Sequence, residues 1–399
     1  MNNIKKVGLV EIIQPMLLIF IIIIILGIVY QLYFFYYKKL HIVPLITNKL
    51  SEIQEENSNN ITNNITYNRC NTIKLQENIQ KVFDDNGIVK DASAWDIYMP
   101  CGYNYVEGEL ESLRAKQITK NKRIFAISGC DKIASKNNLW KILRDYYGRE
   151  GASTIMPESY IINDKKEMKI FKENYQKGKL YLVKKNIQRK EGIIITGNYN
   201  RIIRMWSYKV IQEYVHDLYV LKNRKINIRL YLLVVCYNGK VGGYLYNQGK
   251  CIYTNKDYDE SVASETKEKE VHLTSVNLDT DIYKTHPETL DDLERHLGNP
   301  DYSKLWNNIL NCMKKTMKAS EGHICHLNKL QKAVAFQVFG GDIIFDKDFH
   351  PYLLELNKGP SMKYITVKDK EMKDRLTRDI FSFVGLTKDK LEGHFIRLN

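Results

Sequence analysis

The spacing of hydrophobic and polar residues predicts a mixed α and β protein from about residue 92 onwards. In the first part of this region, short apolar runs typical of strands alternate with stretches in which apolar residues recur at helical spacing. Strands are expected over 123–128, 178–185 and 192–196, and helices over 137–148 and 165–175.

The second part is richer in strands and contains two expected hairpins. Asn238-Gly239 stands between two apolar runs within 210–255, and this dipeptide is a strong signal for a two-residue hairpin turn. Helical spacing returns later in the chain. We expect helices around 290–297 and 305–317, a final hairpin over 336–359 and a C-terminal helix over about 367–385.

The N-terminal region has a different pattern. No charged residue occurs between Glu11 and Lys38, and this apolar run is long enough, at about 25 residues, to cross the hydrocarbon core of a bilayer as a helix. A cleaved signal peptide is the alternative, but its hydrophobic region spans only about 7–15 residues and precedes small residues. Here bulky aromatic residues follow the run. We therefore predict an uncleaved transmembrane anchor over 13–37, after an N-terminal tail over 1–12.

Composition narrows the kind of partner. The 399 residues include 60 Lys and Arg against 46 Asp and Glu, so the formal net charge is +14. By charge alone, this favours a nucleic acid, a membrane surface, a nucleotide or an acidic protein tail as partner. The seven cysteines are scattered and form no C-x-x-C pair, which argues against a disulfide framework and a zinc site and favours a reducing compartment.

The final hairpin carries the most informative polar residues. Side chains alternate between the two faces of a strand, so Glu355 and Asn357 project to the same side. If Phe345 pairs with Tyr352, the antiparallel register places Asp342 opposite Glu355. Three oxygen-bearing side chains without Cys or His suit Mg²⁺. An ordinary solvated strand face explains the same residues equally well at this point.

Two lysines beside apolar runs indicate an anion site. Lys184 lies in the apolar run KLYLVKK, and Lys225 directly precedes INIRLYLLV. A cation next to a buried strand is costly unless an anion pairs with it, and phosphate is a suitable anion. For each lysine alone, the favoured alternative is a strand-end side chain that reaches water.

Three long motifs follow one another in the second half of the chain: KINIRLYLLV, HLTSVN over 272–277, and FQVFGGDIIFDKDFHPYLLELNKGPS. Their order and spacing resemble the tubulin-tyrosine ligase-like family of the ATP-grasp superfamily. Weaker similarity in IMPESYII, YLVKK and VIQEYV extends the resemblance over roughly residues 120–385. It implies an α+β ATP-grasp fold with antiparallel sheets and flanking helices, here preceded by one transmembrane helix.

The resemblance also implies the domains that follow the anchor. The Asn-rich composition of 51–70 is typical of a flexible linker, and we expect a tether over 38–90. N-terminal and central ligase subdomains are expected over 91–178, and the ATP-grasp catalytic domain with its C-terminal helix over 179–399. Because ATP is abundant in the cytosol, we predict a single-pass membrane protein whose catalytic domain faces the cytosol.

Single residues match functional positions of the family. Asp342, Glu355 and Asn357 match its magnesium ligands, in agreement with the expected hairpin register. Lys225 and Arg229 match catalytic positions, where the arginine is implied to stabilise phosphate or an acyl-phosphate. The residues implied to hold ATP are Lys136, Lys184, Gln212, Glu213, Tyr214, Val215, Lys225 and Thr274.

The chain departs from the family pattern at several positions. Asn227 replaces the aspartate of K-F-D-I-R, and Gln337 replaces the glutamate of F-E-x-x-G. Asn247 and Ile252 stand where many members have an arginine pair, and Lys250 is a candidate for the missing charge. These departures concern the expected amino-acid pocket more than the ATP site.

The resemblance implies an ATP- and Mg²⁺-dependent ligase that joins a free amino acid, with glutamate as one candidate, to a protein carboxylate through an acyl-phosphate. The net charge fits an acidic acceptor such as the C-terminal tail of tubulin. The alternative is a catalytically impaired ATP-grasp module that binds nucleotide and acidic tails at a membrane. No nucleic-acid partner is expected, because the basic residues are dispersed and no nucleic-acid motif occurs.

Overall fold

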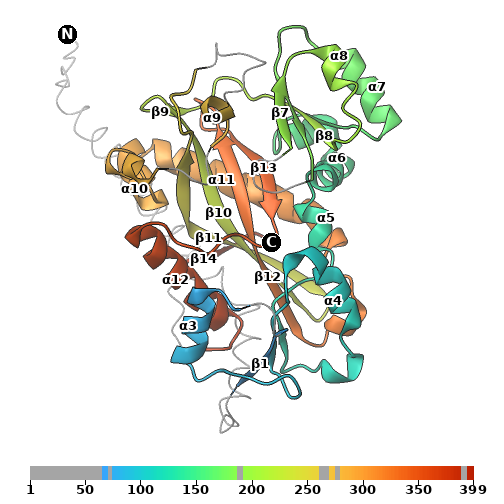
Figure 1. Cartoon of the computed structure of the whole chain (residues 1–399), viewed down its shortest axis with the longest axis vertical. Coiled ribbons are helices and arrows are strands. Elements are labelled where there is room, and N and C mark those ends of the chain that lie inside the picture. The colour runs from blue at the N-terminus through green and yellow to red at the C-terminus, as the bar shows by residue number, and fades with distance from the viewer. Residues whose placement is uncertain (1–64, 71–73, 187–191, 260–268, 275–278, 388–392) are drawn as a thin grey trace, which may run out of the picture. The chain divides into compact units, whose positions relative to one another are not determined.

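The computed structural model describes residues 65–70, 74–186, 192–259, 269–274, 279–387 and 393–399, which belong to one compact unit, Thr62–Asn399. The described residues form two β-sheets with helices around them (Figure 1). This confirms the predicted mixture of helices and strands, and it fits the ATP-grasp-like arrangement that the resemblance implies.

The larger sheet is built around one long hairpin. β10 (Arg224–Tyr237) and β11 (Lys240–Tyr253) are each 14 residues long and pair antiparallel. Asn238 and Gly239 form the turn between them with φ angles of 49° and 70°. These angles lie in the left-handed region, which glycine and asparagine tolerate better than other residues. The predicted Asn-Gly hairpin is therefore confirmed.

The second hairpin pairs with the first one. β12 (Val334–Phe345) pairs antiparallel with β10, and β13 (Pro351–Asn357) pairs antiparallel with β12. Short strands complete the sheet: β14 (Phe395–Arg397) next to β11, β9 (Val220–Leu221) next to β10, and β4 (Arg123–Ile124), β3 (Ile97–Tyr98), β1 (Thr66–Asn68) and β2 (Val89–Lys90) in that order beyond β12.

The first four strands differ from the predicted antiparallel pattern. β1, β2, β3 and β4 pair parallel with one another, and β4 is also parallel to β12. Between β3 and β4 the chain passes through α4 (Val106–Ser112), and such a crossover lets two neighbouring strands run in the same direction. The prediction of antiparallel sheets therefore holds only for the strands from β5 onwards.

The smaller sheet has four antiparallel strands in the order β5 (Ser159–Ile161), β8 (Val210–Glu213), β6 (Tyr181–Lys184) and β7 (Ile193–Thr196). α7 (Lys165–Asn174) and α8 (Tyr199–Ile202) lie beside it (Figure 1). Tyr160, Phe171 and Tyr181 belong to a separate small core of this sheet. This core makes the sheet a rigid wall for the site described below.

Longer helices pack around the larger sheet. α11 (Asp301–Ser320) contacts β11 and β13, and it also contacts α6 (Lys136–Ser153). The predicted helices over 137–148, 165–175, 290–297, 305–317 and 367–385 are confirmed to within a few residues. Two of these predicted helices are α10 (Leu290–Leu297) and α12 (Val367–Phe383). The described residues also form α3 (Glu77–Asp85), α5 (Cys130–Ala134) and α9 (Lys269–His272).

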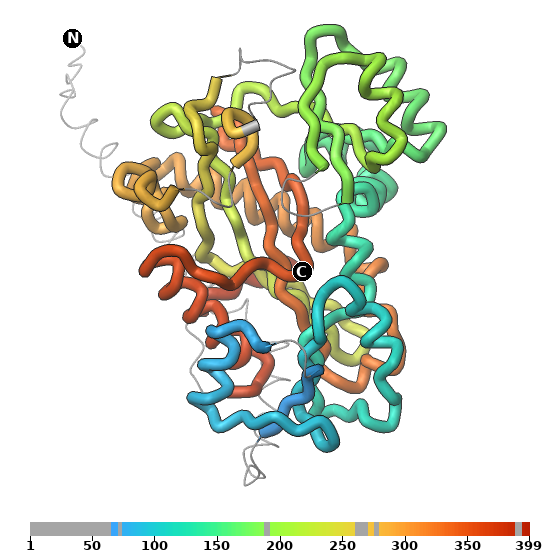
Figure 2. Tube along the Cα trace, viewed as in Figure 1, coloured from blue at the N-terminus to red at the C-terminus, as the bar shows by residue number. Residues whose placement is uncertain are grey.

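The folded part begins before the predicted boundary at residue 91. In the described part of the predicted tether 38–90, the chain forms β1, α3 and β2. α3 packs on α12, where the ring centroids of Phe83 and Phe381 are 5.2 Å apart. Asn78 Nδ2 donates to Thr377 Oγ1 at 2.6 Å. Figure 2 shows these two segments, blue and red, side by side. The tether prediction rested on composition and overlooked the helical spacing of apolar residues in α3.

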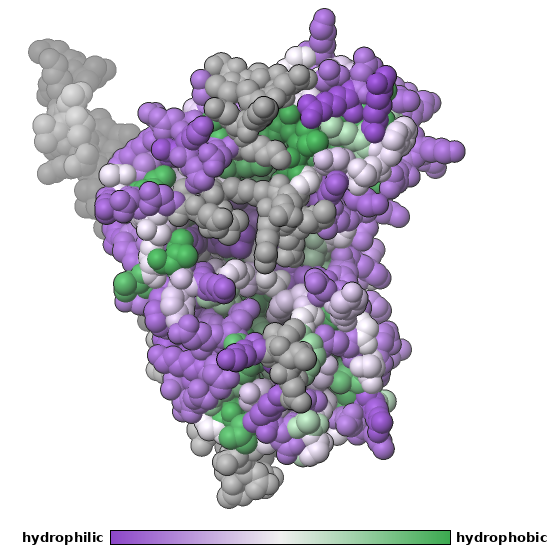
Figure 3. Space-filling model, in the orientation of Figure 1, coloured by the Kyte–Doolittle hydropathy of each residue, from purple (hydrophilic) through white to green (hydrophobic). Residues whose placement is uncertain are grey.

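The predicted membrane localisation requires correction. In the described ranges from residue 65 onwards, no helix is both long enough and apolar enough to cross a bilayer. α11 has 20 residues, but its charged residues, among them Asp301 and Lys315, are not compatible with a membrane span. Hydrophilic residues cover most of the face that Figure 3 shows. These findings contradict the prediction of a single-pass membrane protein facing the cytosol. The predicted anchor, 13–37, lies outside the described residues.

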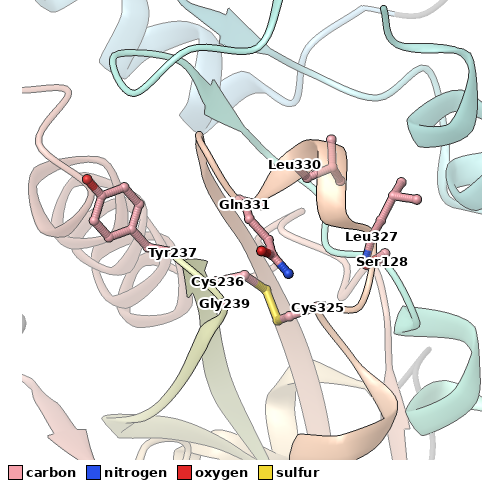
Figure 4. Close-up of a pocket in the computed structure, with 9 residues that line it drawn as sticks. Ser128, Cys236, Tyr237, Gly239, Cys325, Leu327, Leu330 and Gln331 are labelled. Atoms are coloured by element: carbon pink, nitrogen blue, oxygen red, sulfur yellow. A yellow bond between two sulfur atoms is a disulfide. The ribbon is translucent and has the colours of Figure 1, made fainter. Parts of the chain in front are cut away.

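Two pairs of cysteines are joined, contrary to the expectation from the sequence. They are Cys70–Cys101 and Cys236–Cys325, with Cα atoms 5.5 and 5.7 Å apart. Figure 4 shows the second pair, which links the end of β10 to a loop next to Gln331. The partners are 31 and 89 residues apart in the sequence, so no local spacing revealed the pairs. The remaining cysteines are buried thiols: Cys130, Cys251 and Cys312.

Candidate functional site

A cavity of about 740 Å³ is lined by strands of both sheets. β6, β7 and β8 supply its lining from the smaller sheet, and β10, β11, β12 and β13 from the larger one. All residues that the sequence predicts for the site line this cavity, although they are scattered over more than half of the chain. They are Lys136, Lys184, Gln212, Glu213, Tyr214, Val215, Lys225, Arg229, Thr274, Asp342, Glu355 and Asn357.

Four charged side chains form a row across four strands of the larger sheet. Lys250 on β11 lies opposite Arg229 on β10, Arg229 lies opposite Asp342 on β12, and Asp342 lies opposite Glu355 on β13. Directly opposed residues of antiparallel strands share one face, so these side chains project to the same side. Arg229 Nε is 2.5 Å from Asp342 Oδ1, and Lys136 Nζ is 2.6 Å from Glu355 Oε2.

The register of the second hairpin differs from the predicted one near its loop. Phe345 pairs with Pro351, and Tyr352 pairs with the residue before Phe345. The predicted pairing of Phe345 with Tyr352 is therefore wrong by one residue. If this register continued regularly, every later pair on the two strands would also shift by one residue.

A β-bulge restores the predicted pairing at the site. β13 has one extra residue at this point, Leu354, and beyond it Asp342 lies opposite Glu355, as predicted. Without the bulge, Asp342 would lie opposite Leu354 and the two carboxylates would be separated. The bulge therefore brings the two acidic side chains together.

The three predicted metal ligands converge. Asn357 lies on the same strand as Glu355, and its side-chain amide is 3.3 Å from Asp342 Oδ2 and 3.3 Å from Glu355 Oε1. Burial alone would raise the pKa of Glu355, but the ammonium groups of Lys136 and Lys184 and the hydrogen bond from Asn357 together hold this pKa below its ordinary value. Carboxylates brought together in this way are hard-oxygen donors that suit Mg²⁺, and rotation of the Asn357 amide, whose Nδ2 faces them here, adds its oxygen to the same set.

Two lysines lie deep in the cavity. Lys184 and Lys225 are only 5% and 7% exposed, so the alternative of strand-end lysines that reach water is excluded. Burial lowers the pKa of Lys184 to about 8 and that of Lys225 to about 7. Lys225 Nζ lies 5.1 Å from the ring centroid of Tyr214. Among the described residues, no carboxylate oxygen lies within 4.0 Å of Lys225 Nζ.

The lining of the cavity has a surplus of positive charge. Its described cations are more numerous than its carboxylates, and Lys184 and Lys225 in particular are held in a costly charged environment. A polyphosphate would relieve this cost, because a nearby anion favours the charged form of a buried lysine. The residues present therefore fit a bound Mg²⁺-nucleotide.

The segment from Gln212 to Val215 runs along the rim of the smaller sheet. Gln212 is 1% exposed, and its amide contacts Lys184 Nζ and donates to Ser159 Oγ at 3.1 Å. The carboxylate of Glu213 pairs with Lys179 at 2.6 Å. The main-chain N–H groups of Glu213 and Tyr214 are also used inside the protein, where they donate to the carbonyls of Glu158 at 2.8 Å and Leu180 at 3.0 Å.

The structure adds His272 to the site and also places Asn227 there, which the sequence indicated only as a departure from the family pattern. His272 lines the cavity, and its Nδ1 lies 3.0 Å from the hydroxyl of Tyr214. Asn227 also lines the cavity, and its Nδ2 donates to Thr274 Oγ1 at 3.4 Å. His272 opens the HLTSVN motif, so the motif itself was the signal that could have indicated it.

Lys250 does not fill the place of the missing arginines. Its Nζ lies 3.0 Å from Asp369 Oδ2 and 3.9 Å from Glu288 Oε1, and the side chain of Asp369 is fully buried. The lysine therefore belongs to an internal ion pair between β11 and α12. Lys250 and Asn247 are not among the residues that line the cavity, whereas Ile252 is.

Comparison with known proteins gives the same family as the motifs. The model of the tubulin-tyrosine ligase family matches residues 114–392. Tubulin monoglutamylase TTLL4 of Mus musculus is 24% identical over 302 residues, which cover 69% of this chain and 25% of the mouse protein. Tubulin polyglutamylase ttll-4 of Caenorhabditis elegans is 27% identical over 291 residues, which cover 69% of this chain and 48% of the nematode protein.

A third relative matches a shorter part of this chain. Tubulin polyglutamylase TTLL7 of Xenopus tropicalis is 28% identical over 190 residues, which cover 43% of this chain and 21% of the frog protein. The matched parts thus span between about a fifth and about half of the length of these relatives. The family match itself covers well over half of this chain and includes every residue predicted for the site. On this evidence, the chain belongs to the tubulin-tyrosine ligase family.

Proposed function

We propose that this chain catalyses the ATP- and Mg²⁺-dependent ligation of an amino acid to a carboxylate of an acidic protein tail, with tubulin as the first acceptor to test. The observation that carries the proposal is the row of Arg229, Asp342 and Glu355 facing two buried lysines in one cavity. Family membership supports it, as do the names of the relatives, which are tubulin glutamylases. The net charge of +14 suits an acidic acceptor.

In this proposal Asp342, Glu355 and Asn357 hold the metal ion, and Lys184 and Lys225 hold the phosphates. The segment 212–215 lies beside the adenine, and Lys136 and Thr274 complete the binding site. When bound, Mg²⁺-ATP supplies the phosphoryl group that activates the acceptor carboxylate as an acyl-phosphate.

The remaining chemistry is positioning and charge stabilisation. Asp342 holds the Arg229 guanidinium through two hydrogen bonds, of 2.5 and 3.0 Å, so the cation is fixed before the reaction starts. Lys136 is fixed in the same way by Glu355. Cations that need no rearrangement stabilise developing negative charge better than mobile ones do. The amine of the incoming amino acid then displaces phosphate and forms the amide bond.

The proposal is tested by incubating the full chain with tubulin, ATP, Mg²⁺ and labelled amino acids. We expect label in the C-terminal tails, and we expect Glu355→Gln to lower kcat/KM by on the order of 100-fold, as for loss of a preorganised electrostatic group. Glu173→Gln changes the same kind of side chain on the exposed surface of α7 and serves as the matched control. Full activity of Glu355→Gln would contradict the proposal.

A second candidate is a nucleotide-binding module without ligase activity. The replacement of two charged family positions by Asn227 and Ile252, which both line the cavity, favours it. It predicts that ATP binds with Mg²⁺ and that no amino acid is incorporated. Equilibrium binding of labelled ATP, measured beside the ligation assay, separates the two candidates.

A further inference from the structure

Two departures from the family pattern are neighbours in space. Asn227 on β10 and Ile252 on β11 lie directly opposite each other in the antiparallel register. Both line the cavity, and they share the face of the sheet that also carries Lys225 and Arg229. Two changes that are 25 positions apart in the sequence therefore alter one patch of the wall, which we call the neutral wall.

The neutral wall has an unused hydrogen-bond acceptor. Asn227 is only 6% exposed, and its Nδ2 donates to Thr274 Oγ1. Its Oδ1 is buried and accepts no hydrogen bond from the described residues. A buried acceptor without a partner costs about 1–3 kcal/mol, and a ligand that brings an N–H donor removes this cost. The acceptor thus points to a ligand group that donates.

Once the nucleotide is bound, the neutral wall offers no free counter-ion to a carboxylate. Asn227 and Ile252 are uncharged, Lys225 on the same face is assigned to the phosphates in the proposed function, and the other two cations have carboxylate partners. Arg229 binds Asp342 through two hydrogen bonds, and Lys250 pairs with Asp369. Placing a carboxylate against an apolar side chain and an amide oxygen is unfavourable, because a buried charge needs an opposite charge or donors.

We infer that Asn227 and Ile252 determine the specificity for the incoming amino acid, and that they select an uncharged side chain over the carboxylate side chain of glutamate. The amine of the amino acid donates to Asn227 Oδ1, and its side chain packs against Ile252. This inference rests on the proposed function, because it assigns the amino-acid half of the same cavity.

The test compares glycine, alanine, tyrosine and glutamate as substrates of the full chain with tubulin, ATP and Mg²⁺. We expect the best of the three uncharged amino acids to exceed glutamate in kcat/KM by at least about 10-fold, as for one unpaired buried charge. Ile252→Arg supplies a cation. We expect it to raise the ratio of kcat/KM for glutamate to kcat/KM for the best uncharged amino acid by at least about 10-fold. KM for ATP should change by less than about 2-fold. Val367→Arg adds the same charge at an exposed position and leaves the ratio unchanged.

The outcomes separate this inference from the proposed function. Preference of the wild type for glutamate, or an unchanged ratio in a folded Ile252→Arg, overturns the inference while the ligase activity stands. If no amino acid is incorporated, the proposed function fails, and equilibrium dialysis of the same four labelled amino acids against the Mg²⁺-ATP-loaded chain still measures the preference. If Ile252→Arg does not fold, Asn227→Ala takes its place. Because Asn227→Ala lacks the acceptor Oδ1, we expect this variant to bind the preferred amino acid about 10-fold more weakly.

Discussion

Buried charged residues define the site at the scale of single residues. Asp342, Glu355 and Lys136 neutralise one another in part, whereas Lys225 has no carboxylate partner among the described residues. Such an arrangement is unfavourable for the free protein and favourable once an anion binds. The cost is visible in the lowered pKa of Lys225 and leads to a test of stability.

Replacing Lys225 by methionine should remove a pH dependence of stability. Burial lowers the pKa of Lys225 from 10.5 to about 7 in the folded chain, so between these values the unfolded chain binds more protons. The free energy of unfolding of the wild type therefore rises with pH above about 7, by up to a few kcal/mol. In Lys225→Met this rise should be smaller.

Thermal unfolding without nucleotide, at about pH 7 and about pH 9, measures this difference. Lys166→Met, on an exposed position of α7, should behave like the wild type. An identical pH dependence in Lys225→Met and wild type would show that Lys225 is not buried as a cation.

Lys250 should be important for stability rather than for amino-acid binding. It pairs with Asp369, whose side chain is fully buried and also binds Lys373. Lys250→Met leaves the buried carboxylate with Lys373 as its remaining partner, so part of the charge stays compensated and we expect a cost of at most about 3 kcal/mol of unfolding free energy. KM for the amino acid should change by less than about 2-fold, since Lys250 does not line the cavity.

Urea unfolding and ligation kinetics check both parts of this prediction. Lys284→Met is the control, because Lys284 forms an exposed ion pair with Asp281 and such pairs contribute at most about 1 kcal/mol. A large rise in KM for the amino acid with unchanged stability would show instead that Lys250 contributes to amino-acid binding.

At the scale of elements, Gln337 joins the two segments that flank the site. It is fully buried on β12; its Oε1 accepts from the N–H of Ile127 at 3.1 Å, and its Nε2 donates to the carbonyl of Lys358 at 2.8 Å. Lys358 directly follows the proposed metal ligand Asn357 and also pairs with Asp131 at the start of α5. Gln337 thus fixes the end of β13 relative to the segment that leads to Lys136.

Gln337→Glu should loosen this connection, because an ionised glutamate cannot donate to the Lys358 carbonyl. An unsatisfied buried group costs about 1–3 kcal/mol, so Tm should fall, together with the affinity for Mg²⁺. A protonated glutamate can donate, and burial at this position should raise the pKa of the new carboxyl, so the loss should be larger at about pH 8 than at about pH 5.5.

Differential scanning calorimetry at the two pH values measures the effect, with Gln176→Glu at an exposed position as control. If Gln337→Glu lowers Tm equally at both pH values, the missing donor is not the cause.

At the scale of the whole molecule, the net charge of +14 bears on the encounter with the acceptor. Opposite charges on enzyme and tail attract over distances that salt screens, so raising ionic strength from about 50 to about 200 mM should raise KM for tubulin at least about 3-fold. KM for ATP should rise less, because the lysines of its site are buried and salt screens buried charges less. Tubulin without C-terminal tails should show no such salt dependence, and equal salt effects on both substrates would speak against charge-driven recruitment.

Much of the fold and of the site could be predicted from local patterns. Strand alternation placed Glu355 and Asn357 on one face, Asn238-Gly239 predicted its hairpin, and helical spacing located most helices. The position of Lys184 and Lys225 beside apolar runs favoured solvent-exposed side chains, and only the motifs predicted them as residues of the site. These features depend on a few neighbouring residues, and short-range geometry is the same in any fold.

Other features depended on contacts between distant parts of the chain. The extra residue Leu354, which keeps Asp342 opposite Glu355, results from how β13 packs on β12 as a whole. The pairing of Lys250 with Asp369 joins residues 119 positions apart and keeps the Lys250 cation from the neutral wall. The sequence by itself determined which side chains could meet across a hairpin. Only the tertiary structure decided which charges neutralise one another, because the partner of a buried charge is set by three-dimensional packing.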